Sequence, residues 1–246
     1  MSFDIQFTKE NLNTYLKELG KEFRKLNGTK MPAEIILIGG AAILANYSFR
    51  EMTYDIDAII LASSAMKEAI NHVGDKLNLP TGWLNEDFKN TKSYSNKLLE
   101  VSIYYKTFSN ILTIRTVSAE YLVAMKLMSG RRYKNDLSDI AGILREHQRN
   151  GTPITQEAVS RAVTILYGSW TDIPVNSKKF IEAAFKSGDY ETMYLQNVDS
   201  ENQSKDILID FDKSNPGKLR KLDGEDISTI LEQARRKRQN KKINRN

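Results

Sequence analysis

Residues 35–60 read IILIGGAAILANYSFREMTYDIDAII. The aliphatic run Ile35–Ile38 has the length and composition of a buried strand, and it stops at two glycines. The apolar residues from Ala41 to Tyr47 predict a short helix, and Ile56–Leu61 predict a second strand. The segment therefore has the order strand, glycine turn, helix, strand.

Two features of this segment can carry chemistry. Gly39 and Gly40 let the backbone approach a ligand closely, and the N-terminus of the following helix offers free N–H groups to a phosphate. Asp55 and Asp57 occupy alternate positions of a strand, so both carboxylates should lie on one face, about 7 Å apart. Two such acids can hold a pair of divalent ions. Each feature alone also fits a plain turn, a helix cap or surface charge.

The two features together are more specific, because the 14 residues 41–54 separate Gly40 from Asp55. This arrangement resembles the signature of the nucleotidyltransferase superfamily, which has the polymerase-beta-like fold. The Gly-Gly form, with Arg50 ahead of the acids, looks most like the bacterial abortive-infection toxin-type nucleotidyltransferases and their uncharacterised relatives. The resemblance covers about residues 35–145.

The resemblance implies an α/β (α+β) fold, with a mixed sheet, flanking helices and a helical C-terminal half. It also implies Mg²⁺-dependent (or Mn²⁺-dependent) transfer of a nucleoside monophosphate from an NTP to an acceptor hydroxyl. Asp55 and Asp57 would hold the metal, while Gly39, Gly40 and Ala41 would bind the nucleotide. Relatives commonly carry Ser or Thr where this chain has Ala41, so one phosphate contact is expected to be missing.

A third acid is usual in the superfamily, on the strand beside the first two. Glu100 is the candidate, on a strand predicted over Leu98–Tyr105. It would complete the metal site or accept the proton of the acceptor hydroxyl. The alternative is a solvent-facing Glu on an edge strand, and many relatives have Asp at this position.

Residues 118–140 read SAEYLVAMKLMSGRRYKNDLSDI and resemble a downstream pair of helices in the same families. Lys126 lies on an apolar helix and needs either a phosphate or a structural aspartate as its partner. Arg131, Arg132 and Lys134 form a basic turn. This turn either grips the triphosphate or an RNA acceptor, or it is simply solvated.

Asp136 and Asp139 follow that turn. At the start of a helix, acids stabilise the helix dipole and cap its N–H groups. We interpret them mainly as structural residues, although toxin-type relatives would place a functional Asp here.

Composition excludes several other kinds of site. The chain of 246 residues has no Cys and two His, which removes disulfides, thiolate catalysis and Cys-bound zinc, and leaves oxygen ligands for any metal. It contains no P-loop, no dinucleotide-binding glycine motif and no Gly-x-Ser-x-Gly elbow. No apolar run is long enough to cross a membrane, and the first residues lack a secretory pattern, so we expect a cytoplasmic protein without a membrane partner.

Periodicity and composition predict three regions. These are an α/β domain over 1–117, a helical domain over 118–190 and a polar, weakly structured extension over 191–246 that ends in a basic helix or tail. Residues 218–246 hold 10 basic and 4 acidic side chains and so carry a net charge of +6. The whole chain carries +5, so residues 1–217 carry −1. The basic residues 235–245 are either a solvated end or an arm that contacts RNA or tRNA phosphate.

The acceptor suggested by these patterns is RNA or tRNA, a protein side chain or a small molecule. The chain is expected to be an enzyme, either alone or within a toxin–antitoxin or phage-defence system with a cognate antitoxin or toxin protein. The alternative is a catalytically degenerate module of the same fold that binds nucleic acid or a protein partner.

Overall fold

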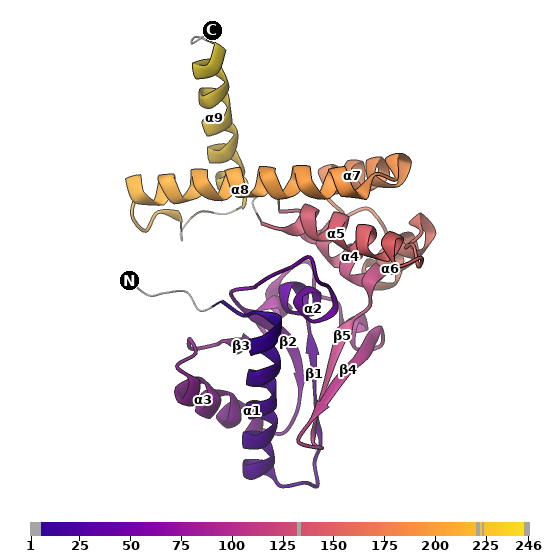
Figure 1. Cartoon of the computed structure of the whole chain (residues 1–246), viewed down its shortest axis with the longest axis vertical. Coiled ribbons are helices and arrows are strands. Elements are labelled where there is room, and N and C mark those ends of the chain that lie inside the picture. The colour runs from indigo at the N-terminus through magenta and orange to yellow at the C-terminus, as the bar shows by residue number, and fades with distance from the viewer. Residues whose placement is uncertain (1–5, 132–133, 220–221, 223, 244–246) are drawn as a thin grey trace.

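The computed structural model describes residues 6–131, 134–219, 222 and 224–243. It confirms the predicted class, a mixed α/β part followed by a helical part (Figure 1). Among the described residues, no helix combines the length and apolar character needed to cross a membrane.

The sheet has the strand order β3-β2-β1-β5-β4 within the described residues. β1 is central, and four of its five residues are buried, as suits a strand covered on both faces. It pairs antiparallel with β2, with Leu37 opposite Ala58, and parallel with β5. The strands are β1 (Ala33–Leu37), β2 (Ile56–Leu61), β3 (Leu84–Asn85), β4 (Ser102–Phe108) and β5 (Leu112–Val117).

Two long helices lie side by side along the sheet, and a short one leads from β1 back towards β2 (Figure 1). The first helix is capped by Thr8, whose hydroxyl accepts a hydrogen bond from the Asn11 N–H. The side-chain oxygen of Asn11 in turn accepts one from the Thr8 N–H. These helices are α1 (Lys9–Asn27), α2 (Gly39–Asn46) and α3 (Ala65–Leu77), and the short 3₁₀ helices η1 (Asp87–Asn90) and η2 (Asn96–Leu99) precede β4.

The helical part lies beyond one end of the strands, and the last helix projects away from it (Figure 1). α8 packs along α5, and α4 packs on both α5 and α6. The helices are α4 (Ala119–Ser129), α5 (Asp136–Arg149), α6 (Gln156–Tyr167), α7 (Val175–Ser187), α8 (Tyr190–Ser214) and α9 (Gly224–Ile243).

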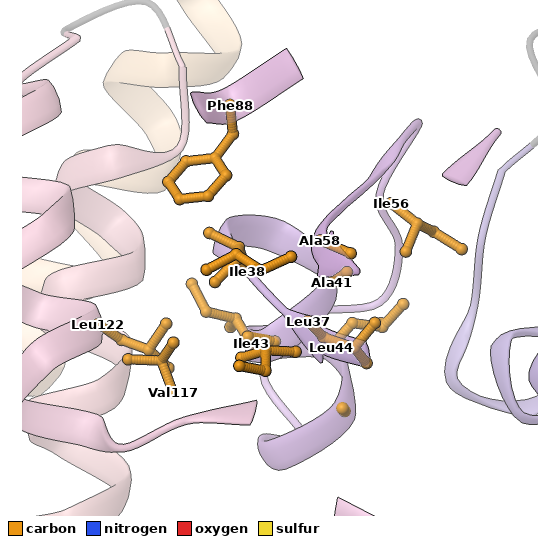
Figure 2. Packing of buried hydrophobic residues seen from close by; sticks show 14 of the residues in the cluster. Leu37, Ile38, Ala41, Ile43, Leu44, Ile56, Ala58, Phe88, Val117 and Leu122 are labelled. Carbon is orange, nitrogen blue, oxygen red and sulfur yellow. The ribbon is translucent and has the colours of Figure 1, made fainter. Parts of the chain in front are cut away.

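A single hydrophobic cluster joins the sheet to the helical part. Ile43 of α2 lies beside Val117 at the end of β5 and Leu122 of α4, and all three are fully buried (Figure 2). The Phe88 ring points towards Ile38, at the end of β1 (Figure 2). This packing holds the glycine turn between the sheet and the helices.

Two sequence expectations are wrong. Residues 190–214 form the long helix α8 rather than a weakly structured extension, because α8 packs extensively along α5 while burying few side chains and staying polar elsewhere. The strand predicted from Leu98 begins only at Ser102, since residues 96–99 form the 3₁₀ helix η2 and Glu100 follows it.

Candidate functional site

A cleft of about 930 Å³ opens where the end of β1 and the loop before β2 face α4, α5 and α8. It gathers most of the residues that the sequence singled out. Those that line it are Gly39, Gly40, Arg50, Asp55, Asp57, Lys126, Arg131, Lys134 and Asp136. Segments distant in sequence therefore meet at one hollow.

The glycine turn closes tightly against the loop before β2. Gly39 has φ +54°, and a side chain there would begin 3.9 Å from Asp57 Oδ2. A Cβ on Gly40 would lie 2.7 Å from Thr53 Oγ1 and 3.2 Å from Arg50 Nη2. Both glycines are needed, one for its backbone conformation and the other for space.

α2 begins at this turn without a side-chain cap among the described residues. The first N–H groups of a helix have no partner within the helix and carry partial positive charge, so they can bind an anion. Ala41 belongs to this first turn, but its side chain is buried in the core and does not line the cleft (Figure 2). Only its backbone can therefore face a ligand.

Asp55 and Asp57 bring two negative charges to the same cleft. Ile38 N–H donates to the Asp57 carbonyl at 2.9 Å, which ties the start of β2 to the glycine turn. Burial and the neighbouring Asp55 raise the pKa of Asp57 to about 6, although Lys134 and Arg131 act in the opposite direction. Burial is the larger cause of this rise and the charge of Asp55 the next, so a cation beside the two carboxylates would favour their ionised forms.

Asp87 is a site residue that sequence reasoning missed. It lies in η1, directly after β3, and β3 pairs in parallel with β2 beside Asp57. It lines the cleft, and its charge adds to the rise in the pKa of Asp57. The signal was weak, because β3 has only two residues and gives no clear strand pattern.

Glu100 does not join these acids. It follows η2, its side chain is 66% exposed and its nearest cation is Lys97, 3.1 Å away. β4, the strand expected to carry it, lies at the far edge of the sheet and is separated from β2 by β1 and β5. The predicted placement of Glu100 beside Asp55 and Asp57 is wrong, because a 3₁₀ turn replaces the first part of the predicted strand.

A chain of charged side chains, all but Arg131 largely buried, forms one wall of the cleft. Lys126 Nζ donates to Asp136 Oδ1 at 2.9 Å and lies 2.7 Å from Asp139 Oδ2. Arg131 binds Asp136 through its backbone N–H and its guanidinium, while Arg50 Nη1 holds both oxygens of Asp139 at 2.6–2.7 Å. These contacts lock the loop before β2 to α4 and α5.

The network fixes the charge of its members. Burial alone would lower the pKa of Lys126, but Asp139 and Asp136 outweigh it and hold that pKa above its usual value. Burial likewise would raise the pKa of Asp136, yet Lys126 and Arg131 hold it far below its usual value. Lys126 is thus a structural partner of aspartates, one of the two roles expected for it. Asp139 lies behind the lining, in the same network.

The other basic residues behave differently. Lys134 is exposed at the cleft, where it faces the Asp55–Asp57 pair. Arg132 lies outside the described residues. In the C-terminal basic run, Arg235 donates to Ser204 Oγ at 2.8 Å and so attaches α9 to α8, while the side chains from 237 onward lie outside the described set.

α8 packs along α5 and supplies a further wall, which the sequence did not predict. Glu201 is buried there and accepts the Ser138 N–H at 3.1 Å, at the start of α5. Burial raises its pKa to about 7, and Asp139 and Asp136 add to the rise. The α8 residues that line the cleft are Glu201, Asn202, Lys205, Leu208, Ile209, Asp212 and Lys213.

Comparison with known proteins agrees with this geometry. A family model described as "Nucleotidyltransferase of unknown function (DUF6036)" matches residues 14–146, which include the glycine turn, both cleft aspartates and the buried charge network. No match was found among curated proteins or solved structures.

Proposed function

The chain belongs to this family of nucleotidyltransferases, and we propose on that premise that it transfers a nucleoside monophosphate from an NTP to an acceptor hydroxyl, using Mg²⁺ or Mn²⁺. One observation carries the proposal: the N-terminus of α2, which begins at Gly39, and the carboxylates of Asp55 and Asp57 line the same cleft. The first suits phosphate and the second suits a divalent cation.

The donor set fits magnesium. Among the described residues, no group of three acidic or histidine side chains could hold a metal ion. Mg²⁺ commonly uses one or two carboxylates and takes its remaining ligands from water and substrate phosphates. Asp55 and Asp57 would hold the ion, which when bound supplies charge that stabilises the leaving pyrophosphate and lowers the pKa of the attacking hydroxyl.

The protein's own groups would place the reactants. Backbone N–H groups of Gly39 and Gly40 would bind the triphosphate, and Lys134 would add positive charge from the α4–α5 connection. The acceptor oxygen would form a bond to the α-phosphorus, the bond from that phosphorus to the pyrophosphate oxygen would break, and the hydroxyl proton would pass to solvent water. The fixed network behind the cleft would keep these groups in register.

Asp57→Asn tests the proposal. We expect transfer of label from α-labelled NTPs to total RNA or protein to fall by roughly 10²-fold or more, because the metal contributes several kcal/mol to the transition state. Asp75→Asn, which changes an exposed acid of α3 outside the cleft, serves as the matched control.

Binding gives a second readout of the same variant. At a concentration 100 times Kd, Mn²⁺ with a non-hydrolysable NTP should stabilise the parent against heat by about 2.7 kcal/mol, and Asp57→Asn should lose this gain. If Asp57→Asn transfers label as well as the parent, the proposal is wrong. The acceptor and the finer likeness to abortive-infection toxins stay predictions.

A second candidate is a binding module with a degenerate site. Two observations favour it: Ala41 offers no hydroxyl to a phosphate, and Glu100 stands outside the cleft. In that case RNA binding should be salt-sensitive and should survive the loss of both Asp55 and Asp57. Metal-dependent, saturable NTP binding would decide for the enzyme.

A further inference from the structure

An exposed aromatic ring stands at the cleft beside the acidic pair. Tyr54 lies one residue before Asp55, lines the cleft and is 46% exposed. Phe88, the other aromatic in the lining, is only 6% exposed and has its ring in the core. Among the described residues that line the cleft, Tyr54 is therefore the aromatic side chain that can offer a ring face to a ligand.

The ring meets a cation from the α8 wall. Lys205 Nζ of α8 lies 5.6 Å from the centre of the Tyr54 ring and 3.4 Å from its hydroxyl. Both side chains are exposed, so this contact contributes little to stability and can be exchanged for another at small cost. An ammonium group that leaves the ring is well placed to meet an anion in the same cleft.

The nearby lining adds apolar surface. Met52 precedes Tyr54 on the loop, and α8 contributes Leu208 and Ile209, the latter 43% exposed. Apolar and aromatic groups beside a charged end are the usual composition of a site for a ligand with a flat ring and a phosphate chain. The acidic pair and glycine turn account for the phosphate end only.

We propose that Tyr54 is the stacking surface for a nucleobase, and that Lys205 turns from the ring to a phosphate of the same ligand. The inference rests on the proposed function and extends it from the phosphates to the base. The base belongs either to the NTP or to a single-stranded polynucleotide acceptor. Aromatic rings stack on any base because every base has a π-face.

Tyr54→Ala separates base binding from phosphate binding. Three probes are used with Mg²⁺ at equilibrium: a non-hydrolysable ATP analogue, inorganic tripolyphosphate and a short single-stranded RNA. We expect about a tenfold weaker Kd, equivalent to ~1.4 kcal/mol, for the base-bearing probe that uses the site. Tripolyphosphate has no base, so its Kd should not change.

Two further variants isolate the ring. Tyr54→Phe keeps the stacking face and loses the hydroxyl, so it should bind like the parent. Tyr104→Ala removes an exposed tyrosine of β4 that does not line the cleft, and it should change none of the three affinities. Thermal melts without ligand check that each variant folds.

Each pattern of results has one meaning. Loss for the ATP analogue alone assigns the base to the NTP, and loss for RNA alone assigns it to the acceptor. Equal loss for tripolyphosphate, or no loss for either base-bearing probe, overturns the inference while the proposed function stands. If the parent binds none of the three probes, both fail together.

Discussion

Lys126 shows how a single buried charge can organise this cleft. It is 8% exposed and contacts both Asp136 and Asp139, on the helix that follows its own. The apolar neighbours of Lys126 in sequence predicted that it needs a partner, yet left phosphate and aspartate both open. The choice depends on the turn between α4 and α5, which brings a residue ten positions away into contact.

Lys126→Met should therefore damage the fold as well as any chemistry. Removing one partner leaves carboxylates buried without compensation, which costs about 3–5 kcal/mol in other proteins. We expect a value near 3 kcal/mol, because Arg50 and Arg131 remain bound to the two aspartates. Urea unfolding measures the loss.

A double variant provides the control for that measurement. Lys126→Met combined with Asp136→Asn removes one of the two carboxylates left behind, so it should recover part of the lost stability. A Lys126→Met protein as stable as its parent, with only nucleotide affinity reduced, would instead make Lys126 a phosphate ligand.

Glu201 carries a prediction about pH. Its pKa is raised from 4.5 to about 7 in the folded chain, so the folded state holds the proton more tightly than the unfolded state. The resulting stability is fully present below about pH 4.5 and is lost as the pH rises through 7. Over this window the change is on the order of 3 kcal/mol.

Glu201→Gln should remove that dependence, because the amide stays neutral and its oxygen can still accept the Ser138 N–H. We expect the variant to match the parent near pH 4.5 and to exceed it at pH 8. Glu34→Gln, at an exposed position of β1, should leave the pH profile unchanged. Parallel profiles for parent and Glu201→Gln would contradict the assignment.

At the scale of elements, the strand–turn–helix around Gly39 combines a backbone requirement with the binding role proposed above. A side chain in the left-handed region costs about 1–2 kcal/mol. Gly188, the C-cap of α7, has φ +66° and open space around it, so it imposes the same backbone strain away from the cleft. The two glycines form a matched pair.

We expect Gly39→Ala and Gly188→Ala to lose comparable stability, about 1–2 kcal/mol each. Gly39→Ala alone should also weaken binding of tripolyphosphate with Mg²⁺, because its methyl group points towards Asp57 Oδ2. Thermal melts and titration calorimetry of the two variants make the comparison. Equal phosphate affinity in both would remove the glycine turn from the site.

The elements that the sequence predicted correctly are those whose own pattern determines them. β2 was predicted with the bounds it has, Ile56–Leu61, because five of its six residues are apolar and Asp57 alone interrupts them. α8 was missed for the opposite reason: its buried residues include Glu201 and Ser204, so it has no apolar stripe to detect. The prediction that Glu100 lies on a strand was wrong because a local 3₁₀ turn forms there instead.

The same contrast holds for the site. The glycine turn and the Asp55–Asp57 pair lie within one local segment, and sequence alone placed them together. Asp87 and α8 come from elsewhere in the chain, and only tertiary packing brings them to the cleft. Sequence reasoning therefore predicted the side of the cleft that holds the glycine turn and the acidic pair, and it missed the α8 wall.

At the scale of the whole molecule, a continuous core argues against independent halves. The hydrophobic cluster includes residues from Phe7 in the sheet part to Tyr190 at the start of α8. Sequence patterns predicted a boundary near residue 117, yet Leu122, just beyond it, is buried beside Ile43 of α2 (Figure 2). Parts that share a core tend to unfold together.

The chain has two tryptophans, and they report on the two parts separately. Trp83 is buried in the sheet part and donates to the Ile70 carbonyl at 3.0 Å, while Trp170 follows α6 and donates to Ser160 Oγ at 3.2 Å. Trp170→Phe leaves a reporter in the sheet part, and Trp83→Phe leaves one in the helical part.

Within each single-tryptophan variant, fluorescence and far-UV circular dichroism should give the same urea midpoint, because coincident transitions indicate one cooperative unit. Comparing the two signals within one variant cancels any stability change that the substitution itself causes. A sheet-part reporter that unfolds at a different urea concentration from the helical signal would show that the two parts are separate domains, and the cleft between them would then be free to open without unfolding either.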